Sequence, residues 1–316
     1  MVEIVHKNTL PLVTVGLAFY NVEKTLASAV KSVLLQTYDN FEFILIDDGS
    51  TDDSFTIAES LALLDDRIIL INGEKNMGVG YRLNQITDLA NGEYIVRMDA
   101  DDLMLPDKIE KQMTVLLADP QLDLIDCNAY IIDKWNCPVG KRKANDLSNL
   151  TLRKILKSRT VFFHPTVIAK TGWFKANRYD ENFRRGPDFE LWCRTFGKTN
   201  YARLINPLFI YREGKVSICN YELNMESFRR SLKMYHINNL SPFELQKEIM
   251  ISHIKTFMYR IFGFFNLQHL LTATRNTQLN GEEKEKINSY IEYIKELDLQ
   301  QDFSHNTSVK MQAWLN

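Results

Sequence analysis

The chain of 316 residues is long enough for one large domain or two. Its 45% hydrophobic and 11% aromatic content indicates a globular protein and excludes disorder. Because 38 basic side chains are balanced by 40 acidic ones, we expect no nucleic-acid partner. No apolar run approaches the roughly 20 residues that span a bilayer. The N-terminus lacks signal-peptide features and the four cysteines lack metal-ligand spacing, so we expect a cytoplasmic protein with reduced thiols.

The first third of the chain alternates between short apolar runs and helical periodicity. Apolar, β-branched runs predict strands over 12–19, 41–46, 68–71 and 94–98. Apolar residues at helical spacing predict helices over 22–36 and 54–64, and from a glycine-containing turn to about residue 89. This alternation predicts an α/β fold with a mostly parallel, Rossmann-like sheet flanked by helices.

Acidic residues recur where these strands end. Asp47 and Asp48 follow the second predicted strand, and the sequence DADD, from Asp99 to Asp102, follows the fourth. Open α/β sheets bind their ligands at the carboxyl ends of the strands. We therefore expect a ligand site along this edge of the sheet.

The pattern changes in the remainder of the chain. A helix is predicted from Pro106 to Leu117, followed by a strand over 122–132 and a polar loop. From residue 221 to about residue 297 the chain favours helix, with a turn at Asn280. We expect a main domain over 1–220 and a helical C-terminal extension over 221–316.

The DADD cluster offers ligands for a hard divalent cation. Mn²⁺ and Mg²⁺ take oxygen ligands, often one or two carboxylates with waters. Asp99 and Asp101 face the same side of an extended backbone, whereas Asp102 faces away unless the chain turns. Asp101 is the first candidate ligand. The alternative is a solvated turn that caps the helix near Pro106.

The strand-end series LAFYN, ILIDDGSTDDS, KNMGVGYRLN and GEYIVRMDADD resembles, in its order and separations, the nucleotide-binding half of family 2 glycosyltransferases with the GT-A fold. The resemblance covers about residues 11–215 and implies a nucleotide half over 11–102 and an acceptor half over 103–220. It implies inverting, metal-dependent transfer of a sugar from a nucleotide diphosphate, with UDP favoured. The acceptor would be the hydroxyl of a saccharide or lipid-linked saccharide, in polysaccharide or glycolipid synthesis.

The resemblance also implies roles for individual residues. Asp48 would accept a hydrogen bond from the base imide, and Asp99 would meet the ribose or the metal. Asp48 could instead stabilise a tight turn at Gly49, and Asn21 could cap a helix. The residues expected to bind the nucleotide sugar are Phe19, Tyr20, Asn21, Asp48, Asn76, Arg82, Asp99 and Ala100.

An inverting displacement needs one carboxylate to take the proton of the acceptor hydroxyl. The segment RRGPDFELWCR resembles the glutamate-aspartate motif of the family, with Pro187 where the glutamate is usual. Asp188 is the expected base, and Glu190 competes because the start of the helix decides which carboxylate is presented. Asp188 could instead be a helix N-terminal residue favoured by the macrodipole.

Aromatic residues and a histidine accompany this acceptor side. His164, in the segment FFHPT, could reach the diphosphate or act as a metal ligand with Asp99 and Asp101, or it could be a satisfied core residue. Trp173 and Trp192 could face a sugar ring or pack in the core.

The segment from Ile249 to Leu271 is rich in Phe, Met and Ile. It could pack on the main domain, form a homodimer, or make a peripheral contact with the inner face of a membrane. Two other functions compete with glycosyl transfer. A sugar-phosphate nucleotidyltransferase normally has a glycine-rich basic loop after the first strand, which LAFYNVEKT lacks. A catalytically inactive nucleotide-binding module is the second alternative.

Overall fold

The computed structural model describes residues 10–142, 147, 150–158, 162–214, 217–265, 267 and 276–299. Four parallel strands form one half of a nine-stranded sheet. They are β3 (Ile68–Ile71), β2 (Phe41–Asp47), β1 (Val13–Phe19) and β4 (Tyr94–Asp99), in this spatial order. Their bounds match the expected strands within two residues, because each is an apolar run, buried in β1, β2 and β4 and partly exposed in the edge strand β3.

The other half of the sheet is mixed. Strand β8 (Ile168–Lys170) pairs antiparallel with both β4 and β6 (Leu124–Ile132), and β9 (Tyr201–Arg212) runs parallel to β6. Two short strands complete it at the periphery: β5 (Leu103–Met104) pairs with β9, and β7 (Pro138–Arg142) pairs with β6. Because β8 is antiparallel to both of its neighbours and β9 is parallel to β6, the strands β4, β6 and β9 all point the same way.

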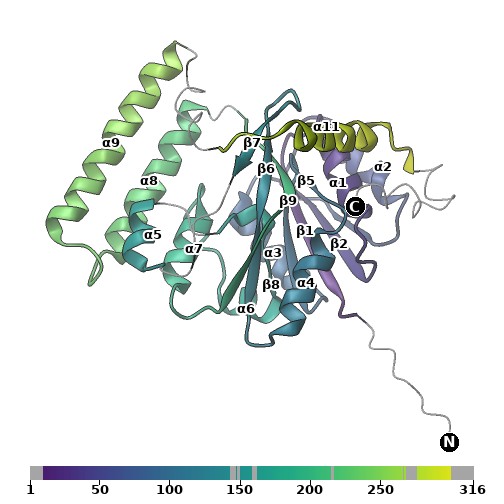
Figure 1. Ribbon diagram of the computed structural model, residues 1–316, viewed down its shortest axis with the longest axis horizontal. Coiled ribbons are helices and arrows are strands. Elements are labelled where there is room, and N and C mark those ends of the chain that lie inside the picture. The colour runs from purple at the N-terminus through teal and green to yellow at the C-terminus, as the bar shows by residue number, and fades with distance from the viewer. Residues whose placement is uncertain are drawn as a thin grey trace, which may run out of the picture.

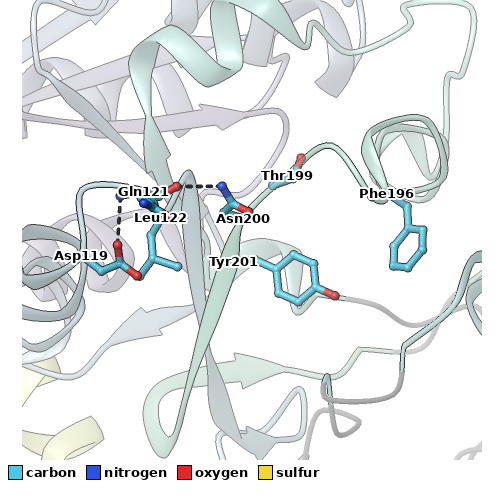
Figure 2. A pocket seen from close by; sticks show the side chains of 8 residues that line it. Asp119, Gln121, Leu122, Phe196, Thr199, Asn200 and Tyr201 are labelled. Atoms are coloured by element: carbon cyan, nitrogen blue, oxygen red, sulfur yellow. Dashed lines mark hydrogen bonds between the residues drawn. The ribbon is translucent and has the colours of Figure 1, made fainter.

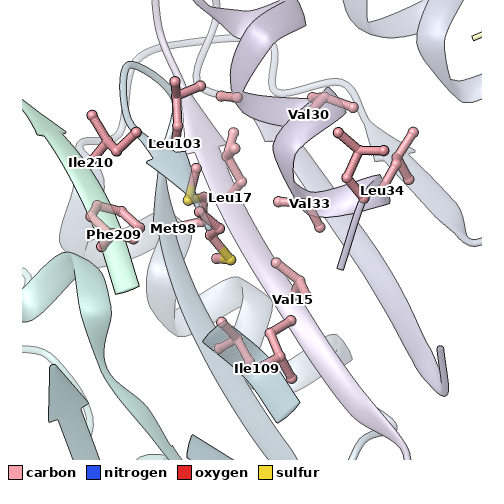
Figure 3. Close-up of a cluster of buried hydrophobic side chains, with 14 of the residues drawn as sticks. Val15, Leu17, Val30, Val33, Leu34, Met98, Leu103, Ile109, Phe209 and Ile210 are labelled. Carbon is pink, nitrogen blue, oxygen red and sulfur yellow. The ribbon is translucent and has the colours of Figure 1, made fainter. Parts of the chain in front are cut away.

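Helices cover both faces of the sheet (Figure 1). One hydrophobic cluster joins the sheet to α1 (Leu26–Leu34), α2 (Ser54–Ala62), α4 (Lys108–Ala118) and α11 (Gly281–Glu296). Figure 3 shows part of it, where Val30 and Val33 of α1 face Val15 and Leu17 of β1. The second cluster joins the opposite face to α3 (Val79–Leu89), α5 (Leu152–Ser158), α6 (Thr171–Ala176), α7 (Pro187–Thr195) and α8 (Ile218–Tyr235).

The C-terminal part divides into two differently placed pieces. Helix α8 pairs with α9 (Pro242–Phe264), and this hairpin projects away from the sheet, with α9 outermost (Figure 1). Helix α11 instead returns to the sheet, where the Tyr290 hydroxyl donates to the Met104 carbonyl at 2.6 Å. Both α9 and α11 begin with a capping box, at Ser241 and Asn280. None of the described helices has the length and apolar character that crossing a membrane requires.

The expected α/β fold is confirmed, with one local correction. The helix expected over 22–36 begins only at Leu26. Asn21 does not cap it, because its backbone is left-handed (φ 52°) and its side-chain oxygen accepts a hydrogen bond from the Thr51 amide at 2.8 Å. Asn21 therefore ties the end of β1 to the loop after β2.

Candidate active site

The carboxyl ends of β1, β2 and β4 meet at one edge of the sheet. In the strand register Phe19 is opposite Asp47, and Ala18 is opposite Asp99. The acidic residues that follow β2 and β4 are thus brought to either side of the end of β1. This is the edge at which a ligand site was expected.

The DADD sequence forms a turn rather than an extension of β4. The Asp102 amide donates to the Asp99 carbonyl at 3.4 Å, so the chain reverses and Asp102 comes back toward its neighbours. One carboxylate oxygen from each of Asp99, Asp101 and Asp102 lies within 4.8 Å of the others. The turn therefore adds Asp102 to the pair expected from the sequence.

Crowding and burial disfavour the ionised forms of these carboxylates. Burial and the charge of Asp99 raise the pKa of Asp101 to about 6. Burial and the charges of Asp101 and Asp99 raise the pKa of Asp102 well above its ordinary value. Asp102 Oδ1 accepts from the Arg212 amide at 2.7 Å, while its buried Oδ2 has no hydrogen-bond partner among the described residues.

These features fit a hard divalent cation. The donor set consists of carboxylate oxygens, the ligands that Mn²⁺ and Mg²⁺ take. An added positive charge would offset the repulsion that raises the pKa of Asp101 and would give the buried Asp102 Oδ2 a partner. The site can therefore hold a cation through Asp101, with Asp99 and Asp102 beside it.

Arg97, which the sequence reasoning missed, is the positive charge beneath this cluster. It is 6% exposed and forms an ion pair with Asp99 through Nη1. Its Nε has no hydrogen-bond partner among the described residues. The sequence did contain a signal for it, namely an arginine inside the apolar strand YIVRM. A buried charge requires a counter-charge nearby, so this arginine indicated a pairing with an acidic residue at the end of the strand.

His164 lies close to Arg97 but is engaged with the protein. Its Nε2 and the Tyr179 hydroxyl are 2.8 Å apart, and its ring contacts that of Trp192. Burial and the charge of Arg97 lower the pKa of His164 well below its ordinary value, so the ring is neutral at neutral pH. Among the described residues, the group of convergent ligand atoms contains the three aspartates and not His164.

Asp188 lies in the first turn of α7, directly after Gly186 (φ 62°) and Pro187. The left-handed Gly186 and the proline at the first helical position start the helix so that Asp188 is half-buried rather than solvated. Burial raises the pKa of Asp188, the charge of Arg97 opposes that rise, and the charge of Asp99 adds to it. The carboxylate of Asp188 therefore shares its surroundings with the Arg97–Asp99 pair.

Glu190 has a different environment. It is 1% exposed, and its Oε1 accepts from the Tyr235 hydroxyl at 2.5 Å and from Arg194 Nε at 2.9 Å. Its side chain thus joins α7 to α8 and leaves no face toward solvent. Of the two residues that competed in the sequence, Asp188 is half-buried and Glu190 is fully buried.

On the β2 side, Asp48 organises the turn that precedes α3. Its Oδ1 accepts from the Met77 amide and from Arg82 Nε, both at 2.8 Å, and its Oδ2 accepts from the Gly78 amide at 2.9 Å. Since a carboxylate has about four acceptor positions, Oδ2 keeps one for a ligand. Arg82 is 5% exposed and also bonds Gln85 and Lys75, so it supports Asp48.

The remaining expected residues differ in accessibility. Tyr20 is 44% exposed at the end of β1, and Asn21 beside it is exposed, whereas Phe19 belongs to the core. Asn76 is exposed on the turn that Asp48 holds, and Ala100 is buried within the DADD turn. Trp173 and Trp192 stack on each other in the core with ring centroids 6.1 Å apart, so neither presents a face to a sugar.

One pocket, of about 380 Å³, is remote from these carboxylates. Figure 2 shows it between the residues before β6 (Asp119, Gln121, Leu122) and those at the start of β9 (Asn200, Tyr201). Because β4, β6 and β9 point the same way, this pocket lies at the amino edge of the sheet and Asp99 at the carboxyl edge. It is not part of the acidic site.

Comparison with known proteins identifies the class. A family model described as "Glycosyl transferase family 2" matches residues 14–178, more than half of the chain. The chain is 33% identical over 238 residues to the "Putative glycosyltransferase EpsE" of Bacillus subtilis, covering 73% of this chain and 80% of that protein. The chain therefore belongs to glycosyl transferase family 2.

Two further likenesses extend over most of the chain. It is 26% identical over 255 residues to the Escherichia coli "UDP-Glc:alpha-D-GlcNAc-diphosphoundecaprenol beta-1,3-glucosyltransferase WfgD", covering 81% of this chain and 91% of that protein. The fold resembles that of mannosyltransferase PcManGT from Pyrobaculum calidifontis, solved in complex with GDP-Man and Mn²⁺, with a TM-score of 0.53 and 15% identity over 98% of this chain and 86% of that one. The expected GT-A type fold is confirmed.

Proposed function

We propose that this glycosyltransferase moves a sugar from a UDP-linked donor to a hydroxyl of a saccharide or lipid-linked saccharide, with inversion at the anomeric carbon. The observation that carries the proposal is the convergence of Asp99, Asp101 and Asp102 beside the Arg97–Asp99 ion pair, with the half-buried Asp188 in the same surroundings. Inverting transfer needs this combination of a diphosphate-binding acidic site and a separate carboxylate base.

The donor would bind along the carboxyl edge of the sheet. Asp101, with Asp99 and Asp102, would hold Mn²⁺ or Mg²⁺ against the diphosphate, and such a cation neutralises the charge that develops on the leaving group. Tyr20, Asn21 and Asn76 would border the base, and the free acceptor position of Asp48 would receive the imide N–H of uracil. PcManGT, whose structure holds GDP-Man and Mn²⁺, supports the metal but shows that this fold also accepts guanine.

Asp188 would take the proton of the acceptor hydroxyl as that oxygen attacks the anomeric carbon. Asp188 is half-buried, and the positive charge of Arg97 favours its ionised, basic form against the effect of burial. Glu190 is withdrawn into its bonds with Tyr235 and Arg194 and would keep α7 in place. The acceptor class is supported by WfgD, whose name gives a diphosphoundecaprenol-linked sugar as its acceptor.

A screen of donor hydrolysis tests the proposal. The purified protein is incubated with a panel of UDP-, GDP- and TDP-sugars, with and without Mn²⁺, and release of the nucleoside diphosphate is measured. We expect release from one or more UDP-sugars only when the cation is present. Hydrolysis of GDP- or TDP-sugars alone would refute the uracil assignment, and binding without hydrolysis or transfer would indicate an inactive nucleotide-binding module.

A further inference from the structure

Arg97 places a buried positive charge against the acidic turn. Its strand, β4, lies between β1 and β8, and the Arg97 amide donates to the Val167 carbonyl at 3.0 Å. The Arg97 side chain is 7% exposed, whereas that of its ion-pair partner Asp99, at the end of the same strand, is 31% exposed. The pair therefore has one buried member, the cation, and one member that reaches the open edge of the site.

Burial of this arginine does not favour the strand itself. Arg97 Nε is buried and has no hydrogen-bond partner among the described residues, and an unsatisfied buried donor costs about 1–3 kcal/mol. The neighbours of Arg97 in β4, Val96 and Met98, are buried apolar residues. Because an apolar side chain at position 97 would avoid the unsatisfied donor, the arginine is better explained by the effect of its charge than by packing.

The charge of Arg97 acts on all three carboxylates of the DADD turn. The ion pair places the guanidinium against Asp99 Oδ2, and because like charges repel, this oxygen is a poor ligand for a second cation. The charge of Arg97 also lowers the pKa of Asp101 and of Asp102, against the larger effect of burial. Arg97 therefore reduces the attraction of the turn for a free divalent cation.

Arg212 is a second positive charge near the turn, but it is bound to neutral groups. Its Nε donates to the Asp101 carbonyl at 2.8 Å, and its Nη1 donates to Asn136 Oδ1 at 2.6 Å. Among the described residues it forms no ion pair with a carboxylate of the turn. Of these two arginines, Arg97 is thus the one that withholds an acidic side chain from a bound metal.

We propose that Arg97 is a positioning residue that holds Asp99 away from the cation, so that the DADD turn binds Mn²⁺ or Mg²⁺ tightly only together with a nucleotide diphosphate. Asp101 and Asp102 are left to face the cation, and the diphosphate adds the oxygen ligands and the negative charge that Asp99 does not supply. The inference rests on the proposed function, since it assumes a cation at this turn. It makes cation affinity depend on the nucleotide, which allows the cation to leave with the product diphosphate.

Calorimetric titration of Mn²⁺ into the full chain, with and without UDP, tests this role. The titrations are made at pH 8, above the value of about 6 to which the pKa of Asp101 is raised. In the unmodified protein, we expect Mn²⁺ alone to bind at least about tenfold more weakly than Mn²⁺ with UDP. In R97Q, Mn²⁺ alone should bind at least about tenfold more tightly than in the unmodified protein, and UDP should add less, because a nearby positive charge is lost and Asp99 is released. A purely structural role for Arg97 would predict weaker binding instead.

The double variant R97Q/D99N tests the same role without leaving either charge unpaired. It loses one charge of each sign, so it should bind Mn²⁺ alone within a few-fold of the unmodified protein. The matched control is R178Q, which removes an arginine from an exposed ion pair with Asp88 on α3 and should leave both titrations unchanged. Circular dichroism checks that each variant is folded.

Three results separate the possible errors. A folded R97Q variant that binds Mn²⁺ no more tightly than the unmodified protein would overturn the role of Arg97. A large loss of Mn²⁺ affinity in R97Q/D99N would identify Asp99 as a metal ligand and would also overturn the proposal. If the unmodified protein binds no Mn²⁺ even with UDP, the metal-dependent function itself fails, and the role of Arg97 fails with it.

Discussion

Replacing Asp188 with Asn separates the base from the rest of the site. The change keeps the shape of the side chain and removes the carboxylate that would take the acceptor proton. Positioned general bases contribute about 10² to 10⁴ in rate, or roughly 3 to 5 kcal/mol of activation free energy. Because Asp188 forms no ion pair with any described residue and is half-buried, we expect the fold and UDP affinity to survive.

The assay is transfer to acceptor at saturating donor, with UDP affinity measured in parallel by calorimetry. Asp66→Asn, which removes an exposed carboxylate, is the matched control and should leave both quantities unchanged. Glu190→Gln should mainly lower thermal stability, because that side chain holds Tyr235 and Arg194. Transfer by Asp188→Asn within a few-fold of the unmodified enzyme, or a Glu190→Gln variant that is stable yet inactive, would refute the assignment of the base.

Two further predictions concern the metal and the core. Since the pKa of Asp101 is raised to about 6 and a cation needs its ionised form, Mn²⁺ affinity should fall roughly tenfold per pH unit below that value. Calorimetric titrations across pH measure this affinity, and a flat profile below pH 6 would contradict the prediction. Tyr290→Phe should cost about 1 kcal/mol of unfolding free energy, because it removes the hydrogen bond to the Met104 carbonyl. Urea unfolding measures this free energy, and an unchanged midpoint would show that this hydrogen bond does not stabilise the fold.

The elements of the first third were predictable because the strands are short apolar runs and the helices have a clear helical period. Strands β1, β2 and β4 are covered on both faces, so their apolar residues mark them directly in the sequence, and the partly exposed β3 is also an apolar run. The strands β5, β7, β8 and β9 were not predicted. Strands of two or three residues, such as β5 and β8, leave no periodic pattern, and they exist because neighbouring strands supply their hydrogen bonds.

Within the site, the sequence identified the acidic residues but not what surrounds them. The position of Asp102 depends on a turn that an extended-strand assumption does not produce. The choice between Asp188 and Glu190 depended on where α7 begins, which Gly186 and Pro187 determine through backbone conformation. Arg97 was overlooked because a charge in an apolar strand was read as part of the strand.

The most direct test of the account is whether UDP binding depends on the DADD turn and on a cation. Calorimetry should show UDP binding to the unmodified protein that strengthens on addition of Mn²⁺, and Asp101→Asn should abolish the effect of Mn²⁺ while the protein stays folded. UDP binding of the same strength with and without Mn²⁺, in both proteins, would contradict the claim that this acidic turn holds a metal against the nucleotide diphosphate.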